Sequence, residues 1–250
     1  MKAEGFELHY HKDEIASGVL WENHCHAHFE MICVLTGDVC VTLEGEELPL
    51  TDGEALLISP LCYHTVSVRK KCTYRRLTVA FEEAEIPPVL RDILHKGGAR
   101  AFHAEHTLTG RLRALCSEEN TAFYAPLAGA LMIQLLYACT ADAGQVDSGG
   151  ADPMLHKALL YMEEHLCERL SLDGIAASIP CSKSFLCHRF QEKMKISPKQ
   201  YILRKRMALA AKLIREGTPP TEVALRVGYE NYSNFYRMYQ KHLQHAPSGG

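Results

Sequence analysis

Hydrophobic and polar residues alternate through the first third of the chain, and this alternation predicts β-strands. Within 39–43, Val and Leu alternate with Cys and Thr, and the same period of two recurs within 77–81. Short runs that contain Gly and acidic residues, at 37–38, 44–46 and 51–53, separate the segments as turns. Residues 6–81 are therefore predicted to form short antiparallel strands arranged as a small barrel or jelly roll.

The period becomes helical from about residue 108. Leucines recur every three or four positions at 108, 112 and 115, and again at 127, 131 and 135. The second of these segments lacks charged residues between Ala122 and Ala141, so we expect it to be buried against the barrel or against a partner chain. We predict that this helical pair, 107–140, forms a dimer surface, which substitution of Leu131 and Leu135 by Asp should disrupt.

The uncharged segment is also long enough to span a bilayer, since about 20 residues suffice. However, Pro126, Gly129 and Gln134 interrupt it, and no cluster of Lys or Arg flanks it. The first residues lead into no apolar stretch of the kind found in secretory signals. We therefore predict no membrane contact and a cytoplasmic location.

The last hundred residues repeat themselves at an offset of 49 positions. Leu186 and Phe190 recur as Phe235 and Tyr239, and in each copy a short apolar helix and a tight connection come first. A helix, a turn and a second helix make up the helix-turn-helix unit, which is thus predicted twice. An amphipathic segment at 198–216 bridges the two copies, and a Gly, Asp and Ser-rich linker at 142–153 precedes them.

The charge of the chain is divided unevenly. Residues 1–151 carry 12 Lys and Arg against 21 Asp and Glu, a net charge of −9, whereas residues 152–250 carry 15 against 9, a net charge of +6. This division indicates two domains, of which only the second suits a polyanion. The ten cysteines are scattered without a C-x-x-C pair, which excludes a zinc ribbon or a thioredoxin-like motif.

The C-terminal repeat resembles the DNA-binding domain of AraC/XylS-type transcription regulators. The motifs that carry the resemblance span about 171–247 and include Ser197-Pro198, Arg206-Met207 and Val227-Gly228-Tyr229. In that family two helix-turn-helix units, separated by the bridging helix, enter successive major grooves of DNA. This chain departs from the family pattern at His188 (usually Arg), at Lys195 and Gln244 (usually Gly) and at Pro220 (usually Ile).

The resemblance assigns the DNA contacts to the two second helices. Residues at the start and on the outer face of each helix are expected to reach base edges or phosphates. Arg237 is suited to bidentate contact with guanine. We expect base contacts from Ser184, Cys187, His188, Tyr232, Ser233, Tyr236 and Arg237, and phosphate contacts from Ser182, Lys183, Arg189 and Asn231.

A second group of candidate functional residues lies in the predicted barrel. His24, His26, Glu30 and Gly37 form the pattern H-x-H-x3-E-x6-G, and Gly53, Pro60 and His64 form G-x6-P-x3-H. Both resemble the half-motifs of cupin barrels, in which three His and a Glu bind a divalent metal. Sensor barrels of AraC-type regulators share this pattern and mostly bind a small organic effector. We therefore expect His24, His26, Glu30 and His64 to contact an effector, with a divalent metal as the alternative.

Together these observations predict a two-domain regulator rather than an enzyme. A cupin-like sensor barrel occupies 1–100, a helical pair 101–141, a linker 142–153 and an all-α double helix-turn-helix domain 154–250. The expected partners are double-stranded DNA, a small-molecule effector, a second copy of the chain and, for an activator, RNA polymerase. Two alternatives stay open: a metal-dependent cupin enzyme with an accessory helical domain, and a helix-turn-helix protein that acts through protein contacts alone.

Overall fold

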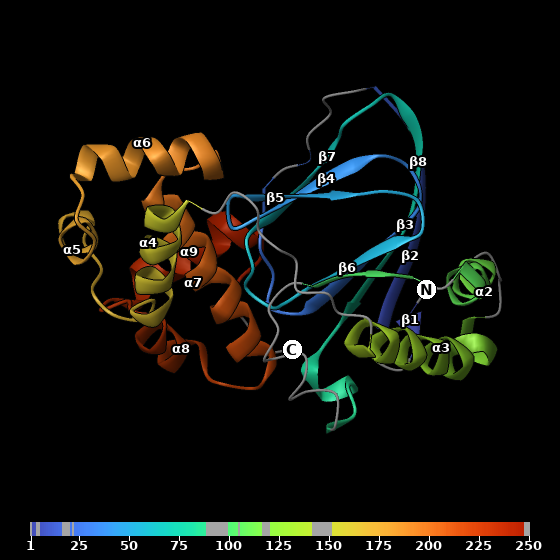
Figure 1. Ribbon diagram of the computed structural model, residues 1–250. Helices are drawn as coiled ribbons and strands as arrows, with labels where there is room; N and C mark the ends of the chain where they lie inside the picture. Colours follow the sequence, from blue (N-terminus) through green and yellow to red (C-terminus); the bar gives the residue numbers. More distant parts are fainter. Residues whose placement is uncertain are drawn as a thin grey trace. The chain divides into compact units, whose positions relative to one another are not determined.

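The fold was analysed in a computed structural model of the 250-residue chain (Figure 1), which describes residues 2–3, 6–16, 21, 23–88, 100–104, 106–116, 121–141 and 152–247. The chain forms two compact units, a β-rich unit drawn from the first 148 residues and a helical unit that includes residues 149–250. The predicted linker lies almost entirely outside the described residues, which resume at Asp152.

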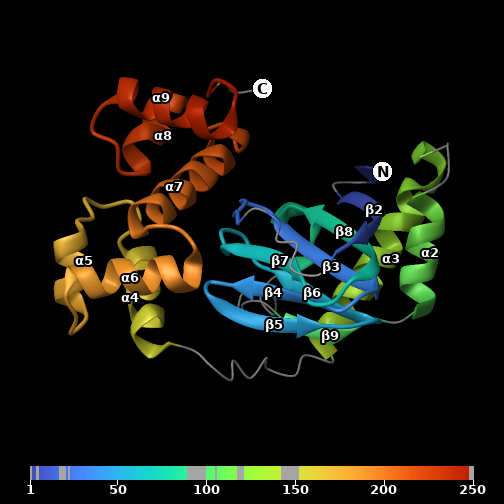
Figure 2. The same cartoon turned by 90° about the horizontal axis from the view of Figure 1, so that it is seen from above.

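Within the described ranges, nine strands form two antiparallel sheets in the β-rich unit (Figures 1 and 2). The larger sheet has the order β1-β2-β8-β3-β6-β9 and the smaller sheet the order β5-β4-β7. The strands are β1 (Lys2–Ala3), β2 (Phe6–Ile15), β3 (Phe29–Thr36), β4 (Val39–Leu43), β5 (Glu46–Leu50), β6 (Glu54–Ile58), β7 (His64–Val68), β8 (Cys72–Phe81) and β9 (Arg100–His103). The alternating pattern thus predicted the antiparallel strands of this unit correctly.

One apolar core fills the space between the two sheets. It joins Ile32, Val34 and Leu56 of the larger sheet to Val39 and Val41 of the smaller one, all at most 3% exposed. Turns at Gly37, Gly45 and Gly53 connect the strands, and each of these glycines has a positive φ that favours a residue without a side chain. After β8 the chain makes a short 3-10 helix, η1 (Glu83–Glu85).

A second core lies on the opposite face of the larger sheet, where α2 (His106–Cys116) and α3 (Thr121–Ala141) pack. It includes Met31 and Val79 of the sheet together with Leu112, Leu131 and Leu135 of the helices. Leu131 and Leu135 are 2% and 0% exposed, so these two leucines face the sheet rather than a partner chain, and the dimer surface of the helical pair stays a prediction. Residues 101–103, predicted as part of the helical pair, belong instead to β9 at the sheet edge.

None of the helices within the described ranges is long and apolar enough to cross a membrane. The long uncharged helix α3 packs Leu131 and Leu135 into the core just described, whereas Leu127 is 41% exposed.

The helical unit contains the two predicted helix-turn-helix pairs. Its helices are α4 (Pro153–Glu164), α5 (Leu172–Ser178), α6 (Lys183–Met194), α7 (Pro198–Arg215), α8 (Pro220–Arg226) and α9 (Tyr232–Leu243). The first pair is α5 and α6, the second is α8 and α9, and α7 bridges them as predicted. Ser197 starts α7 with a capping box, in which its hydroxyl accepts from the amide of Gln200 and the Gln200 side chain accepts from the amide of Ser197.

Each second helix ends in the same way. Lys195 follows α6 with φ +56° and Gln244 follows α9 with φ +61°, and these two residues are 49 positions apart. The left-handed conformation favours glycine because a Cβ crowds the following carbonyl. This geometry explains why the related family usually has Gly where this chain has Lys195 and Gln244.

Candidate DNA interface and sensor site

The second helices of the two pairs, α6 and α9, present matching outward faces. On α6 the buried residues are Leu186, Phe190 and Met194, and on the opposite side Ser184 and His188 are exposed. On α9 the buried residues are Phe235 and Tyr239, and on the opposite side Ser233 and Arg237 are exposed. Positions two before and two after a buried residue lie on the far side of a helix, since each residue turns by about 100°. The two predicted pairs of base-reading residues are therefore structurally equivalent.

Ser182 and Asn231 are the N-caps of α6 and α9. The Ser182 hydroxyl accepts from the amide of Phe185 at 3.2 Å, and Asn231 Oδ1 accepts from the amides of Ser233 and Asn234 at 2.8 and 3.3 Å. These bonds satisfy amides that have no partner within the helix. Both side chains are exposed, so they lie at the surface where a phosphate would meet the helix N-terminus.

The other predicted contacts differ in exposure. Tyr232 is 39% exposed, while Cys187 and Tyr236 are half-buried. Lys183 pairs with Asp173 at 2.9 Å, and Arg237 donates to Asn234 Oδ1 at 2.5 Å, both at the surface. Exposed pairs of this kind are weak in water, so they can be exchanged for other contacts at little cost.

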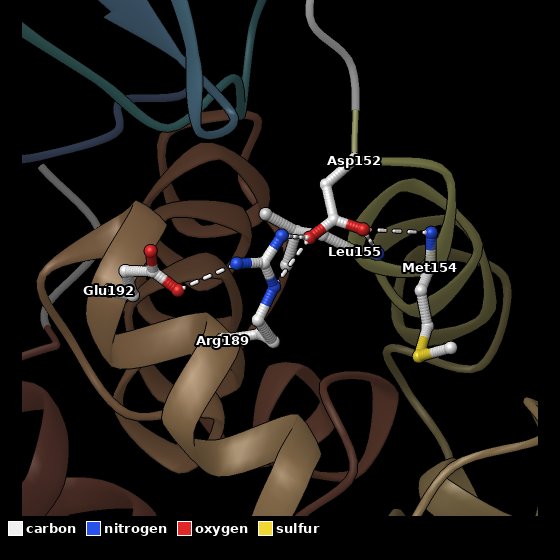
Figure 3. Close-up of polar contacts among 5 residues, drawn as sticks. All are labelled: Asp152, Met154, Leu155, Arg189 and Glu192. Carbon is white, nitrogen blue, oxygen red and sulfur yellow. Dashed lines mark hydrogen bonds and ion pairs between the residues drawn. The ribbon is translucent and has the colours of Figure 1, made fainter.

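Arg189 has a different environment from the one we predicted (Figure 3). Its Nε and Nη2 reach Oδ2 of Asp152 at 2.8 and 2.6 Å, and its Nη1 donates to Glu192 at 2.7 Å. The second carboxylate oxygen of Asp152 caps α4 by accepting from the amides of Met154 and Leu155. Arg189 therefore joins α6 to the start of α4, and its expected phosphate contact would require these ion pairs to break.

The same contacts set the pKa of Asp152. Burial alone disfavours the carboxylate, but the hydrogen bonds from the amides of Leu155 and Met154 and from Arg189 outweigh it. The pKa of Asp152 is therefore lower than usual, and its side chain stays ionised.

In the β-rich unit, Glu30 and His64 meet as predicted. Glu30 lies on β3 opposite Ile58 of β6 and Ala80 of β8, on the face that also carries Ile32 and Val34. His64 begins β7 and is 1% exposed. Its Nε2 lies 3.1 Å from Oε2 of Glu30, while its Nδ1 lies 3.0 Å from the carbonyl oxygen of Cys62.

The two contacts of His64 fix the orientation of its ring. The Cys62 carbonyl can only accept, so the Nδ1 that faces it donates. Nε2 is thereby directed at the Glu30 side chain. A histidine held by a backbone carbonyl on one nitrogen is the usual arrangement for a metal ligand on the other.

The imidazoles of His24 and His26 complete this group. One ligand atom each from His24, His26, Glu30 and His64 can be chosen so that all lie within 4.8 Å of one another. The four residues named from the motif are thus brought together. Three imidazoles and one carboxylate suit a divalent transition metal such as Mn, Fe, Ni or Zn.

The β-rich unit contains a further polar group that the sequence patterns did not predict. Arg76 of β8 pairs with Asp13 of β2 at 2.8 Å, and its guanidinium lies 4.8 Å from the centre of the Tyr74 ring and 5.3 Å from that of Trp21. The Tyr74 hydroxyl is buried and has no hydrogen-bond partner among the described residues. The available signal was the alternation in β8, where 74, 76 and 78 occupy the face opposite to the apolar 77, 79 and 81.

Comparison with known protein families assigns both the β-rich unit and the helical unit. An AraC-like ligand-binding domain model matches residues 9–136, about half of the chain, and a helix-turn-helix domain model matches residues 175–249. The chain belongs to the AraC family of transcriptional regulators. It therefore combines a ligand-binding domain with a helix-turn-helix domain, and the curated relatives are likewise named as transcriptional regulators.

The individual similarities are moderate. The HTH-type transcriptional regulator YdiP of Escherichia coli is 30% identical over 39% of this chain, and YobQ of Bacillus subtilis is 24% identical over 89% of it. The matches cover 32% of YdiP and 85% of YobQ, so the chain spans about a third of the length of the first relative and most of the second. The match to the crystal structure of ToxT from Vibrio cholerae spans 98% of this chain and 96% of that chain, at 11% identity and a TM-score of 0.47.

Proposed function

We propose that this AraC-family member is a ligand-responsive, sequence-specific DNA-binding regulator whose helices α6 and α9 read successive major grooves. The observation that carries the proposal is the equivalence of Ser184 and His188 on α6 with Ser233 and Arg237 on α9. Both pairs are exposed, one turn apart and directed away from the helical core. Arg237 can bind guanine O6 and N7 together, and His188 can donate to or accept from a base edge.

The β-rich unit would supply the ligand response. His24, His26, Glu30 and His64 are the polar contacts that we propose for the effector, because their ligand atoms converge beside the apolar core between the sheets. Effector binding would change how the β-rich unit and α2–α3 hold two DNA-binding domains. That change would alter half-site occupancy or, in an activator, contact with RNA polymerase. Action on chromosomal DNA places the protein in the cytoplasm under this proposal.

The exposed side of α3 is the dimer surface that we now propose. Leu127, Ala130, Gln134 and Tyr137 are exposed and carry no charge, and Leu127 and Tyr137 are 41% and 66% exposed. Their spacing of three, four and three residues is that of a helix seam that packs against a second helix. A second copy of the chain would bring two pairs of recognition helices to paired half-sites.

Selection of genomic fragments tests the DNA proposal. The purified protein is incubated with sheared genomic DNA at about 0.15 M salt, alongside the variant His188→Ala/Arg237→Ala. The variant His156→Ala/Lys157→Ala is the matched control, because it removes one exposed His and one exposed cation from α4. We expect wild type and control to enrich the same few fragments and the recognition-helix variant to lose them. Equal enrichment by all three proteins would contradict the proposed reading residues.

The geometry of His64 favours a second candidate, in which the effector is a divalent transition metal. The buried Nε2 of His64 faces the Glu30 carboxylate while the Cys62 carbonyl fixes the other ring nitrogen. Binding of an ion to the folded protein alone raises its stability. We expect Mn²⁺, Ni²⁺ or Zn²⁺ to raise the melting temperature of wild type but not of Glu30→Gln, with exposed His156→Gln as control. An unchanged melting temperature of wild type for all three ions would leave the organic effector.

A further inference from the structure

Arg206, in the middle of α7, binds backbone atoms from both halves of the helical unit. Its Nε donates to the carbonyl of Leu166 at 2.8 Å and its Nη2 to the carbonyl of Glu168 at 2.5 Å. Both acceptors lie in the connection between α4 and α5. Its Nη1 donates to the carbonyl of Gly228 at 3.4 Å, in the turn between α8 and α9. A single side chain thus joins the connection that precedes the first helix-turn-helix to the turn of the second.

Gly228 brings these two segments into close approach. A Cβ at this position would lie 2.7 Å from the carbonyl oxygen of Cys167 and 3.0 Å from Nη2 of Arg206. The residue also has φ +81°, a conformation that disfavours any side chain. The turn between α8 and α9 therefore packs directly on residues 166–168. The Arg206 guanidinium also lies 6.0 Å from the ring centre of Tyr229, which follows Gly228.

These contacts act close to both recognition helices. The turn at Gly228 runs directly into Asn231, which caps α9, and residues 166–168 lead into α5, which is followed by α6. The helix α7, of 18 residues, connects the two helix-turn-helix pairs. Recognition helices that enter successive major grooves must stand about 34 Å apart in a fixed orientation. A junction across α7 is therefore placed to hold that separation.

We propose that Arg206 is a positioning residue that holds α6 and α9 at one separation, so that the protein discriminates between DNA sites by the spacing of their two subsites. The proposal rests on the proposed DNA-binding function. Arginine is suited to this role because its planar guanidinium offers five donors in fixed directions. A lysine keeps the positive charge but, as one compact ammonium, cannot reach three carbonyls from different segments in the same way.

The test uses a genomic fragment that the wild-type protein selects, together with versions of that fragment in which one or two base pairs are inserted between the two subsites that the protein protects. Dissociation constants are measured for wild type, Arg206→Lys, Arg206→Met and Lys212→Met. Lys212→Met is the control for loss of one positive charge from α7, since Lys212 pairs with Glu216, four positions further along the chain, at 3.8 Å. For wild type and control we expect an insertion to weaken binding about tenfold or more, a loss comparable to that of a mismatched base pair.

For both Arg206 variants we expect the original fragment to bind more weakly and the insertion penalty to fall to about threefold or less, because α6 and α9 are no longer held at one separation. Melting curves establish that the variants are folded, and Arg206→Lys serves if Arg206→Met is not. Weaker binding with an unchanged insertion penalty would show a role in stability alone. Full rescue by lysine would show a phosphate contact, and either result would overturn the proposal. Failure of wild type to select any fragment would instead contradict the proposed function itself.

Discussion

At the scale of single residues, Asp152 combines two roles that substitution can separate. Its Oδ1 caps α4 and its Oδ2 pairs with Arg189. We expect Asp152→Ala to destabilise the helical unit by about 1 kcal/mol through loss of the cap, with a further loss from the ion pair. Asp152→Asn should keep the cap and lose only the ion pair, so it should be the milder change in urea unfolding. Equal losses for the two variants would mean that Asp152 does not act as a cap.

The lowered pKa of Asp152 gives this difference a pH dependence. An acid whose pKa is lower in the folded state stabilises the protein above its unfolded pKa, about 4, and loses that contribution as the pH falls through the folded value. The stability difference between wild type and Asp152→Asn should therefore be constant at neutral pH and shrink below about pH 4. Asp173→Asn, which alters an exposed pair with Lys183, is the control and should show a much smaller difference at neutral pH. A difference that persists unchanged into acid would contradict the assignment.

The left-handed residues after α6 and α9 give a second prediction at this scale. Lys195→Gly and Gln244→Gly should each stabilise the helical unit by about 0.5–1 kcal/mol, because glycine relieves the crowding at positive φ but costs more chain entropy on folding. Both residues are exposed, so little packing is lost. Lys195→Ala keeps a Cβ and should give no gain. Thermal unfolding measures all three, and stabilisation by alanine as well as glycine would exclude backbone conformation as the cause.

At the scale of elements, α3 shows how far periodicity can be interpreted. The leucines at 127, 131 and 135 predict an amphipathic helix, but the pattern is the same whether a sheet or a partner chain covers them. The position of the larger sheet determines which leucines are covered, since it buries Leu131 and Leu135 and leaves Leu127 41% exposed. By contrast, the repeat at 49 positions predicted α6 and α9, because apolar spacing is a local property of the chain.

The revised dimer surface on α3 is tested by charge on its exposed side. We expect Leu127→Glu/Tyr137→Glu to shift sedimentation from dimer to monomer with little change in melting temperature, because neither residue belongs to the core described for the β-rich unit. Leu135→Ala should instead destabilise the unit by about 2–5 kcal/mol, the usual cost of truncating a buried leucine. A double variant that sediments as wild type does would show that copies associate elsewhere or not at all.

At the scale of the whole molecule, net charge overestimates the number of basic side chains that are available to contact DNA. The helical part carries a net charge of +6, yet Arg189 is bound to two carboxylates, Arg206 to backbone carbonyls and buried Lys205 to Glu163. These partners lie between 3 and 42 positions away along the chain, and most follow from tertiary packing that no spacing pattern records. Composition therefore shows which half of the chain is basic but not which of its basic residues are exposed.

The salt dependence of DNA binding follows from this internal pairing and separates base contacts from phosphate contacts. With a few cations on the DNA-facing side, roughly four to six phosphate contacts would give a slope of log K against log salt of about −4 to −5. Arg237→Ala should weaken the selected site by about 1–3 kcal/mol, relax its preference at one base pair and leave the slope nearly unchanged, because a base contact releases few counterions. Arg169→Ala, at an exposed position between α4 and α5, is the control and should change neither quantity. If Arg237→Ala instead lowers the slope by about one and weakens all sequences equally, Arg237 contacts a phosphate, and sequence reading by α9 falls to Ser233 and its neighbours.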